Sequence, residues 1–111
     1  MSYRTLDSND AVDDHLKSDQ PVWLFKHSNS CGVSTVAFEA FTTYLQQHPD
    51  EQAAVVVVQE HRPVSNYIAT TLGAVHKSPQ LFLVHRGEIV WQSSHYGITA
   101  QAMSEARKAA A

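Results

Sequence analysis

Two uninterrupted apolar runs mark the most deeply buried parts of the chain. The first is Val22 to Phe25, which ends at the polar pair Lys26 and His27, and the second is Ala53 to Val58. Strands without polar alternation are typical of the centre of a sheet that helices cover on both faces. The pattern therefore predicts two central strands with helices above and below them.

Four other segments carry apolar residues at spacings of three and four, which predicts amphipathic helices. Each has start or stop signals that suit a helix end. The predicted helices are Ser8 to Leu16 with Asp7 or Ser8 as N-cap, Val33 to just before Pro49, Pro63 to Gly73, and Thr99 to about Lys108.

A hairpin is predicted near the C-terminal end, where Gln80 to Val84 and Glu88 to Gln92 are joined by Arg86-Gly87. The element order is then α-β-α-β-α-β-β-α. We expect an α/β sandwich of three layers, in which helices flank a central mixed four-stranded sheet. At this length, residues 1–111 form one domain.

Composition excludes several classes of function. The 111 residues include eight Lys or Arg and eleven Asp or Glu, for a net charge of −3, and the basic residues are scattered. Scattered basic residues do not form the positively charged patch that is typical of a nucleic-acid-binding surface. No apolar stretch approaches the ~20 residues of a membrane span, and no leader pattern opens the chain. We expect a cytoplasmic protein that binds neither nucleic acid nor membrane; its oligomeric state is not indicated.

The only cysteine, Cys31, lies where the first apolar run gives way to the longest predicted helix. Free backbone N–H groups and the helix dipole stabilise a thiolate at such a position. The alternative is a buried cysteine that behaves as a small hydrophobe. The polar and small neighbours from His27 to Gly32 favour a reactive thiol. With one cysteine, any disulfide must involve another molecule.

Metal and hydrolase chemistry find little support. The seven histidines form no pair at i, i+4, and no second cysteine accompanies them. We therefore predict no metal site and no tightly bound cofactor. A hydrolase that uses cysteine with histidine would need a base brought close by the fold, for which the sequence gives no sign.

The element order, the cysteine at the first strand-to-helix junction, and Ser78-Pro79 directly before the third core strand resemble the thioredoxin fold. Thioredoxin-like proteins keep a cis-proline at this place. The resemblance implies that Pro79 is cis. It also implies that the peptide at Ser78 lies beside the reactive sulfur and offers backbone hydrogen bonds to a thiol-containing chain.

More narrowly, the chain resembles the monothiol bacilliredoxins of the YtxJ type, which are redox proteins of the bacillithiol system. One departure is Gly32, because family members commonly have proline after the cysteine; we expect it to loosen the helix start. The matching segments are Phe25-Lys26-His27-Ser28, Cys31 with Ser34, Arg62-Pro63-Val64-Ser65-Asn66, Ser78-Pro79-Gln80, Val90-Trp91, Ser94-His95-Tyr96 and Ile98-Thr99.

This resemblance implies a thiol-disulfide oxidoreductase in which the Cys31 thiolate takes bacillithiol from a protein mixed disulfide. Its partners would be S-thiolated client proteins, with bacillithiol or another low-molecular-weight thiol as co-substrate. An external thiol must regenerate the enzyme. Ser34 stands where a CxxC motif has its second cysteine, and its hydroxyl could at most donate a hydrogen bond to the thiolate.

Four further residues are candidates for supporting roles, each with a plainer alternative. His27 could favour the thiolate when protonated or pass a proton, but could also be a solvated residue at a strand end. Lys26 could add positive field, although alternation puts Lys26 and His27 on opposite faces. Arg62 could bind a carboxylate of the small thiol or serve as a solvated helix-start residue. For His95, only the resemblance suggests more than a surface loop.

Two other functions stay open. Cys31 to Ser34 resembles the CGFS motif of monothiol glutaredoxins, which bridge an iron–sulfur cluster between two subunits with an external thiol. The chain lacks the Gly-Gly-Asp region of those proteins and has Gln92 to His95 instead. The other is a non-catalytic interaction module of thioredoxin fold, in which Cys31 would be buried and inert.

Overall fold

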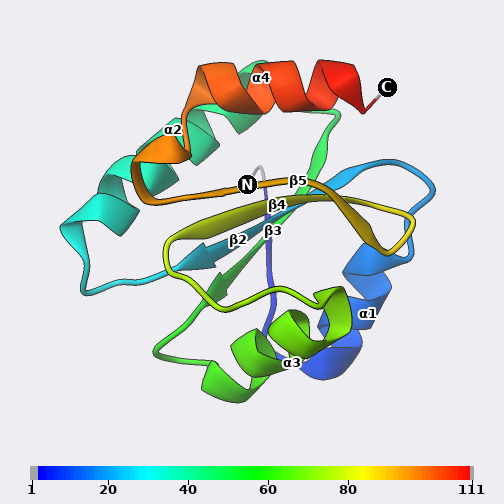
Figure 1. Ribbon diagram of the computed structural model, residues 1–111, viewed down its shortest axis with the longest axis vertical. Helices are drawn as coiled ribbons and strands as arrows, with labels where there is room; N and C mark the ends of the chain where they lie inside the picture. Colours follow the sequence, from blue (N-terminus) through cyan, green and yellow to red (C-terminus); the bar gives the residue numbers. More distant parts are fainter. Residues whose placement is uncertain (1–2, 111) are drawn as a thin grey trace.

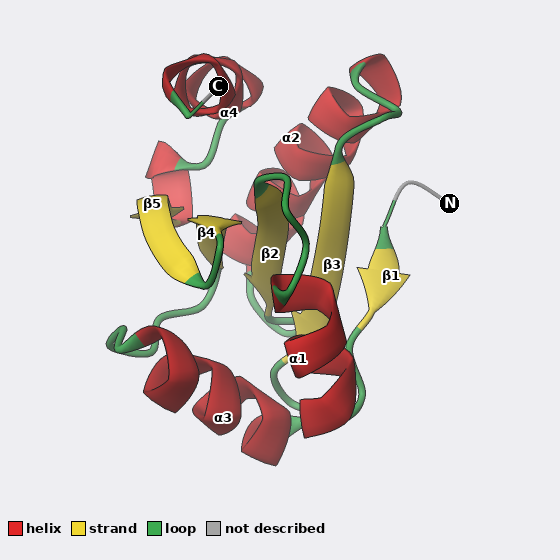
Figure 2. Ribbon diagram, turned by 90° about the vertical axis from the view of Figure 1, so that its right-hand side faces the viewer, coloured by secondary structure: helices red, strands yellow, loops and turns green. Residues whose placement is uncertain are grey.

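Strand β2 (Val22–His27) runs through the middle of a five-stranded sheet with the order β1-β3-β2-β4-β5, as Figures 1 and 2 show. The structure is a computed structural model that describes residues 3–110. β3 (Gln52–Val57) pairs with β2 in parallel, and β4 (Gln80–His85) pairs with its other edge in antiparallel fashion. The remaining elements are β1 (Arg4–Thr5), α1 (Asn9–Leu16), α2 (Gly32–Gln47), α3 (Arg62–Leu72), β5 (Glu88–Ser94), the 3₁₀ turn η1 (His95–Gly97) and α4 (Ala100–Ala109).

Helices cover both faces of the sheet, which confirms the predicted three-layer α/β sandwich. α2 and α4 lie on one face, whereas α1 and α3 lie on the other (Figure 2). Successive β2 side chains alternate between two cores: Trp23 and Phe25 pack with α2 and α4, and Val22 and Leu24 pack with α1 and α3. Both faces of the apolar run are therefore buried, as its sequence indicated.

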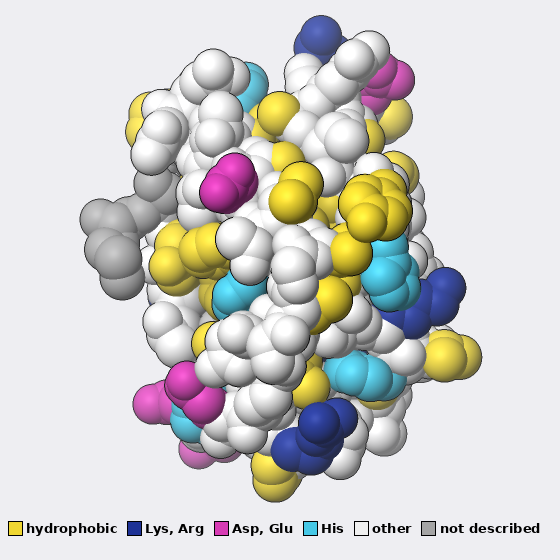
Figure 3. Space-filling model, turned by 90° about the vertical axis from the view of Figure 1, so that its left-hand side faces the viewer, with side chains coloured by type: hydrophobic (Ala, Val, Ile, Leu, Met, Phe, Trp, Pro, Cys, Tyr) yellow, Lys and Arg dark blue, Asp and Glu magenta, His cyan; other side chains and the backbone are white. Residues whose placement is uncertain are grey.

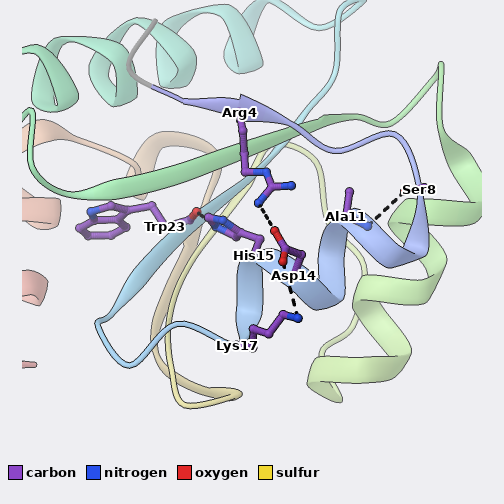
Figure 4. Close-up of polar contacts among 7 residues, drawn as sticks. All are labelled: Arg4, Ser8, Ala11, Asp14, His15, Lys17 and Trp23. Carbon is purple, nitrogen blue, oxygen red and sulfur yellow. Dashed lines mark hydrogen bonds and ion pairs between the residues drawn. The ribbon is translucent and has the colours of Figure 1, made fainter.

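The predicted helix ends are present. The Ser8 hydroxyl accepts a hydrogen bond from the Ala11 amide at 3.1 Å (Figure 4), and the Thr99 hydroxyl accepts one from Ala102 at 3.0 Å. Gly73 closes α3 with a φ of 65°, a conformation that glycine adopts without steric cost. These caps satisfy backbone groups that a helix leaves free at its ends.

α1 is fixed to the sheet by a buried histidine. The His15 Nε2 lies 2.8 Å from the backbone oxygen of Trp23, so this nitrogen carries the proton and donates (Figure 4). Burial lowers the pKa of His15, which keeps the imidazole neutral. Arg4, Asp14 and Lys17 form ion pairs on the nearby surface (Figure 4). Exposed pairs of this kind add little to stability.

Two features of the fold differ from the sequence-based expectation. The sheet has five strands, not four, because the polar segment Arg4–Thr5 pairs with β3 at the edge. Two residues are too few to show a strand period. The last strand also runs two residues further than predicted, to Ser94 in place of Gln92, before the 3₁₀ turn His95–Gly97. Within residues 3–110, no helix is both long enough and apolar enough to cross a membrane.

Candidate functional site

Cys31 is the N-cap residue of α2 and is partly exposed. Its backbone is extended, with φ −122° and ψ 123°, and its side chain makes no capping hydrogen bond. The sulfur is therefore not committed to holding the helix start. Partial exposure at the first turn of a helix fits a thiol that reacts with other molecules, and it argues against a buried, inert cysteine.

Gly32 is the first residue of α2, so the helix begins at the residue after the cysteine despite the glycine. A Cβ atom built on Gly32 would meet nothing within 4 Å. Neither crowding nor a left-handed backbone therefore requires glycine at this position.

The loop before Cys31 is held by Gln59, which follows β3. The Gln59 amide nitrogen donates to the hydroxyls of Ser28 at 2.7 Å and Ser30 at 2.9 Å. Its amide oxygen accepts from the Asn29 backbone N–H at 3.2 Å. Sequence reasoning missed Gln59. The available signal was its place directly after a central strand, because β2 and β3 are parallel and end at the same edge of the sheet.

Ser34 is fully buried, and its hydroxyl is occupied by the strand end. The oxygen accepts a hydrogen bond from the Ser28 backbone N–H at 2.9 Å and lies 2.8 Å from the Nδ1 of His27. The direction of the contact with Nδ1 depends on the tautomer of His27. Among the described residues, no hydrogen bond joins Ser34 to the Cys31 sulfur, so the serine organises the junction and does not solvate the thiolate.

His27 is half-buried, and its side chain packs against α2. Its ring stacks on Phe38 with centroids 4.6 Å apart and planes inclined by 27°. Burial lowers the pKa of His27, so the imidazole is neutral at neutral pH. The tautomer with the ring proton on Nε2 would let Nδ1 accept from the Ser34 hydroxyl, and the other tautomer would donate to it. The lowered pKa disfavours a role for His27 as a permanent positive charge beside the thiolate.

Removing the Ser34 hydroxyl is expected to weaken this junction measurably. Ser34→Ala leaves the buried Ser28 N–H without its acceptor, which costs about 1 to 3 kcal/mol of the free energy of unfolding. Urea denaturation measures the change. Thr43→Ala, on the exposed face of the same helix, serves as the control and should lose less than about 0.5 kcal/mol. Equal losses in both variants would contradict the assigned contact.

The Ser78–Pro79 peptide bond is cis, as the resemblance implied. The carbonyl oxygen of Pro79 accepts a hydrogen bond from the backbone N–H of His95 at 3.2 Å. The register pairs Lys26 with Gln80, so Pro79 lies one residue further along, at the end of the sheet where β2 leads into the Cys31 loop. The proline and the cysteine loop therefore share one edge.

The remaining candidates, Arg62, His95 and Lys26, differ in burial and in position. Arg62 is exposed at the first position of α3. His95 is exposed and has a φ of 54°; its contact with Pro79 is made by the backbone. Lys26 is fully buried on the face of the sheet that α3 covers, so the expectation that it merely ends the buried run is wrong. It lies on the opposite face from His27, as alternation predicted.

The face of the molecule in Figure 3 carries the starting ends of α2 and β4. Hydrophobic side chains gather across the middle of this face, and histidine side chains lie among them. Within residues 3–110, no group of three or more His, Cys, Asp or Glu is placed to hold a metal ion. The site is thus a single thiol in a surface that mixes apolar and polar groups.

Comparison with known proteins agrees with this geometry. A model of the family described as monothiol bacilliredoxin BrxC matches residues 4–103. The chain belongs to this family. As a monothiol bacilliredoxin family member it is a redox protein of thioredoxin fold, and the Cys31 site is the one thiol through which it can act.

Solved structures extend the comparison. A structure described as a proposed oxidoreductase with a thioredoxin fold is 30% identical, with a TM-score of 0.88 and coverage of 95% of this chain and 93% of that one. Thioredoxin from Malassezia sympodialis is 13% identical, with a TM-score of 0.78 and coverage of 97% and 90%. Thioredoxin from Fasciola hepatica is also 13% identical, with a TM-score of 0.77 and coverage of 97% and 99%. The two thioredoxins establish the fold alone.

Proposed function

We propose that this bacilliredoxin family member removes bacillithiol from S-thiolated client proteins. The Cys31 thiolate attacks the bacillithiol sulfur of the mixed disulfide. A new disulfide forms between Cys31 and bacillithiol, the original disulfide breaks, and the client cysteine leaves as a thiolate that takes a proton from water. One disulfide is exchanged for another, so this step needs no external oxidant or reductant.

A second thiol must complete the cycle. Free bacillithiol, or another low-molecular-weight thiol, attacks the bacillithiol sulfur bound to Cys31. This attack restores the Cys31 thiolate and releases a small-molecule disulfide. The chain has no other cysteine, so it cannot resolve the adduct itself. Ser34, at the position of a resolving cysteine, has its hydroxyl engaged with Ser28 and His27.

The observation that carries the proposal is the state of Cys31: one partly exposed thiol at a helix start, in a chain of the monothiol bacilliredoxin family. A partly exposed sulfur can reach a disulfide on another protein. Its place at the N-cap of α2, beside free backbone N–H groups, is a common setting for a nucleophilic cysteine. Both properties suit the first step.

The surroundings suit docking of a client chain. Three large apolar side chains near this edge are well exposed: Val36 at 59%, Val75 at 81% and Tyr96 at 77%. They come from the start of α2, from the loop before Pro79 and from η1. Exposed apolar groups that gather on one face often mark a protein-binding surface. We expect them to contact residues that flank the modified client cysteine.

A stoichiometric transfer experiment tests the proposal. A single-cysteine protein loaded with bacillithiol is mixed with one equivalent of this protein, and both are followed by intact-mass spectrometry. We expect the client to lose one bacillithiol and Cys31 to gain one, with no further turnover until free bacillithiol is added. A client mass that stays unchanged would overturn the proposal. Cluster absorbance that depends on Cys31, after anaerobic purification, would favour an iron–sulfur carrier instead.

A further inference from the structure

A lysine is fully buried in the central strand of the sheet, and the exchange chemistry above makes no use of it. Lys26 is 0% exposed, between Phe25 and His27 in sequence. Among the described residues it forms no ion pair with a carboxylate; its Nζ lies 3.2 Å from the Nδ1 of His76. Burying an amine without a counter-charge is costly, so such a residue usually serves a site.

The amine is directed at the loop that ends in the cis-proline. His76 lies three residues before Pro79, and its Nδ1 is also 3.4 Å from the hydroxyl of Ser65 on α3. Because Nδ1 faces the lysine, it accepts and Nζ donates. The buried strand is thereby connected through one hydrogen bond to the loop between α3 and β4.

The strand partner of Lys26 holds the same loop. Gln80 pairs with Lys26 across β2 and β4 and is 2% exposed. Its amide oxygen accepts from the Lys77 backbone N–H at 3.1 Å, and its amide nitrogen donates to the Val75 carbonyl oxygen at 3.1 Å. Buried side chains on two adjacent strands therefore contact three consecutive residues, 75–77. Ser78 and Pro79 follow them directly.

We infer that Lys26, acting through His76, is a positioning residue that holds the loop 75–78 so that its backbone can dock a client chain beside Cys31. The kinetic test of this inference rests on the proposed function, because it measures the transfer of bacillithiol from a client. In this role the lysine touches no substrate. It restricts the loop before the client arrives, which lowers the entropic cost of docking. Loss of the lysine should therefore weaken client binding and leave the exchange step at the sulfur unchanged.

The kinetic test compares Lys26→Met with Lys17→Met, the same substitution at the exposed lysine that follows α1. The substrate is a single-cysteine protein loaded with bacillithiol. We expect Lys26→Met to raise KM about fivefold to tenfold and to change kcat less than twofold, with Lys17→Met at wild-type values. His76→Ala should raise KM similarly, and the double variant should add little. A KM within twofold of wild type in folded Lys26→Met would overturn the inference.

Hydrogen exchange gives a readout that needs no substrate. The amide of Lys77, which donates to the Gln80 side chain, should exchange about tenfold faster in Lys26→Met and in His76→Ala, whereas the amides of β3 keep their protection. Unchanged exchange in both variants would also overturn the inference. The partly exposed His76 keeps this test available if Lys26→Met fails to fold. If no variant transfers bacillithiol at all, the proposed function fails, but the exchange measurement still decides the role of Lys26.

Discussion

Replacing Cys31 by serine is expected to abolish transfer of bacillithiol, a loss of about three orders of magnitude or more, while the fold survives. A serine hydroxyl stays protonated at neutral pH and cannot form the disulfide through which exchange passes. The chain offers no second thiol to take over. The initial rate of bacillithiol release from a loaded client measures the effect.

The same substitution should not weaken the helix. Cys31 is the N-cap of α2 with an extended backbone, and its side chain makes no capping hydrogen bond. Serine is among the preferred N-cap residues because its hydroxyl accepts from a free backbone N–H of the first turn. We expect the free energy of unfolding to stay equal or to rise by up to about 1 kcal/mol. Residual release above the rate without enzyme, in a folded variant, would show that another group performs the chemistry.

The fold was predictable because its strongest signals are local. Val22 to Phe25 and Ala53 to Val58 are apolar without interruption, and the helices carry caps at Ser8 and Thr99 that the structure confirms. The edge strand Arg4–Thr5 escaped prediction because its pairing is set by β3, some fifty residues away in sequence. Tertiary pairing of so short a polar segment leaves no periodic trace.

The site was predictable only in part. The position of Cys31 followed from the junction of an apolar run and a helix, and the cis peptide at Pro79 followed from a family resemblance. The hydrogen-bond partners of Ser34 could not be predicted, because only the folded backbone brings Ser28 and His27 to its hydroxyl. Gln59 was missed for the same reason: its contacts join loops at the ends of two different strands.

The burial of Lys26 is the clearest failure of sequence reasoning, and it leads to a prediction about stability. A lysine after four apolar residues indicates the end of a buried strand. The Lys26 side chain is nevertheless 0% exposed, so β2 stays buried beyond the apolar run. Burial lowers the pKa of Lys26 from 10.5 to about 8. Its hydrogen-bond partner His76 supplies no negative charge, and Arg62, which acts on His76, adds a positive one.

Lys26→Met is therefore expected to stabilise the protein at pH 7 by about 2 kcal/mol. The lowered pKa alone corresponds to about 3 kcal/mol, at roughly 1.4 kcal/mol per pH unit, and the lost hydrogen bond to His76 offsets about 1 kcal/mol. Between pH 8 and 10.5 the unfolded chain binds more protons than the native state, so wild-type stability rises with pH there. The advantage of the variant should be full below pH 8 and should shrink toward pH 10.5.

Urea denaturation of both proteins at pH 7 and pH 10 checks the sign and the pH window. Destabilisation of Lys26→Met at both values, or a difference that does not change with pH, would contradict the assigned cost of the buried amine. A Lys26→Met variant that is more stable and yet binds its client more weakly would separate the lysine's cost in stability from its role in positioning the loop 75–78. A residue kept only for packing would lose stability and client binding together, whereas a positioning residue can cost stability in order to hold a docking loop in place.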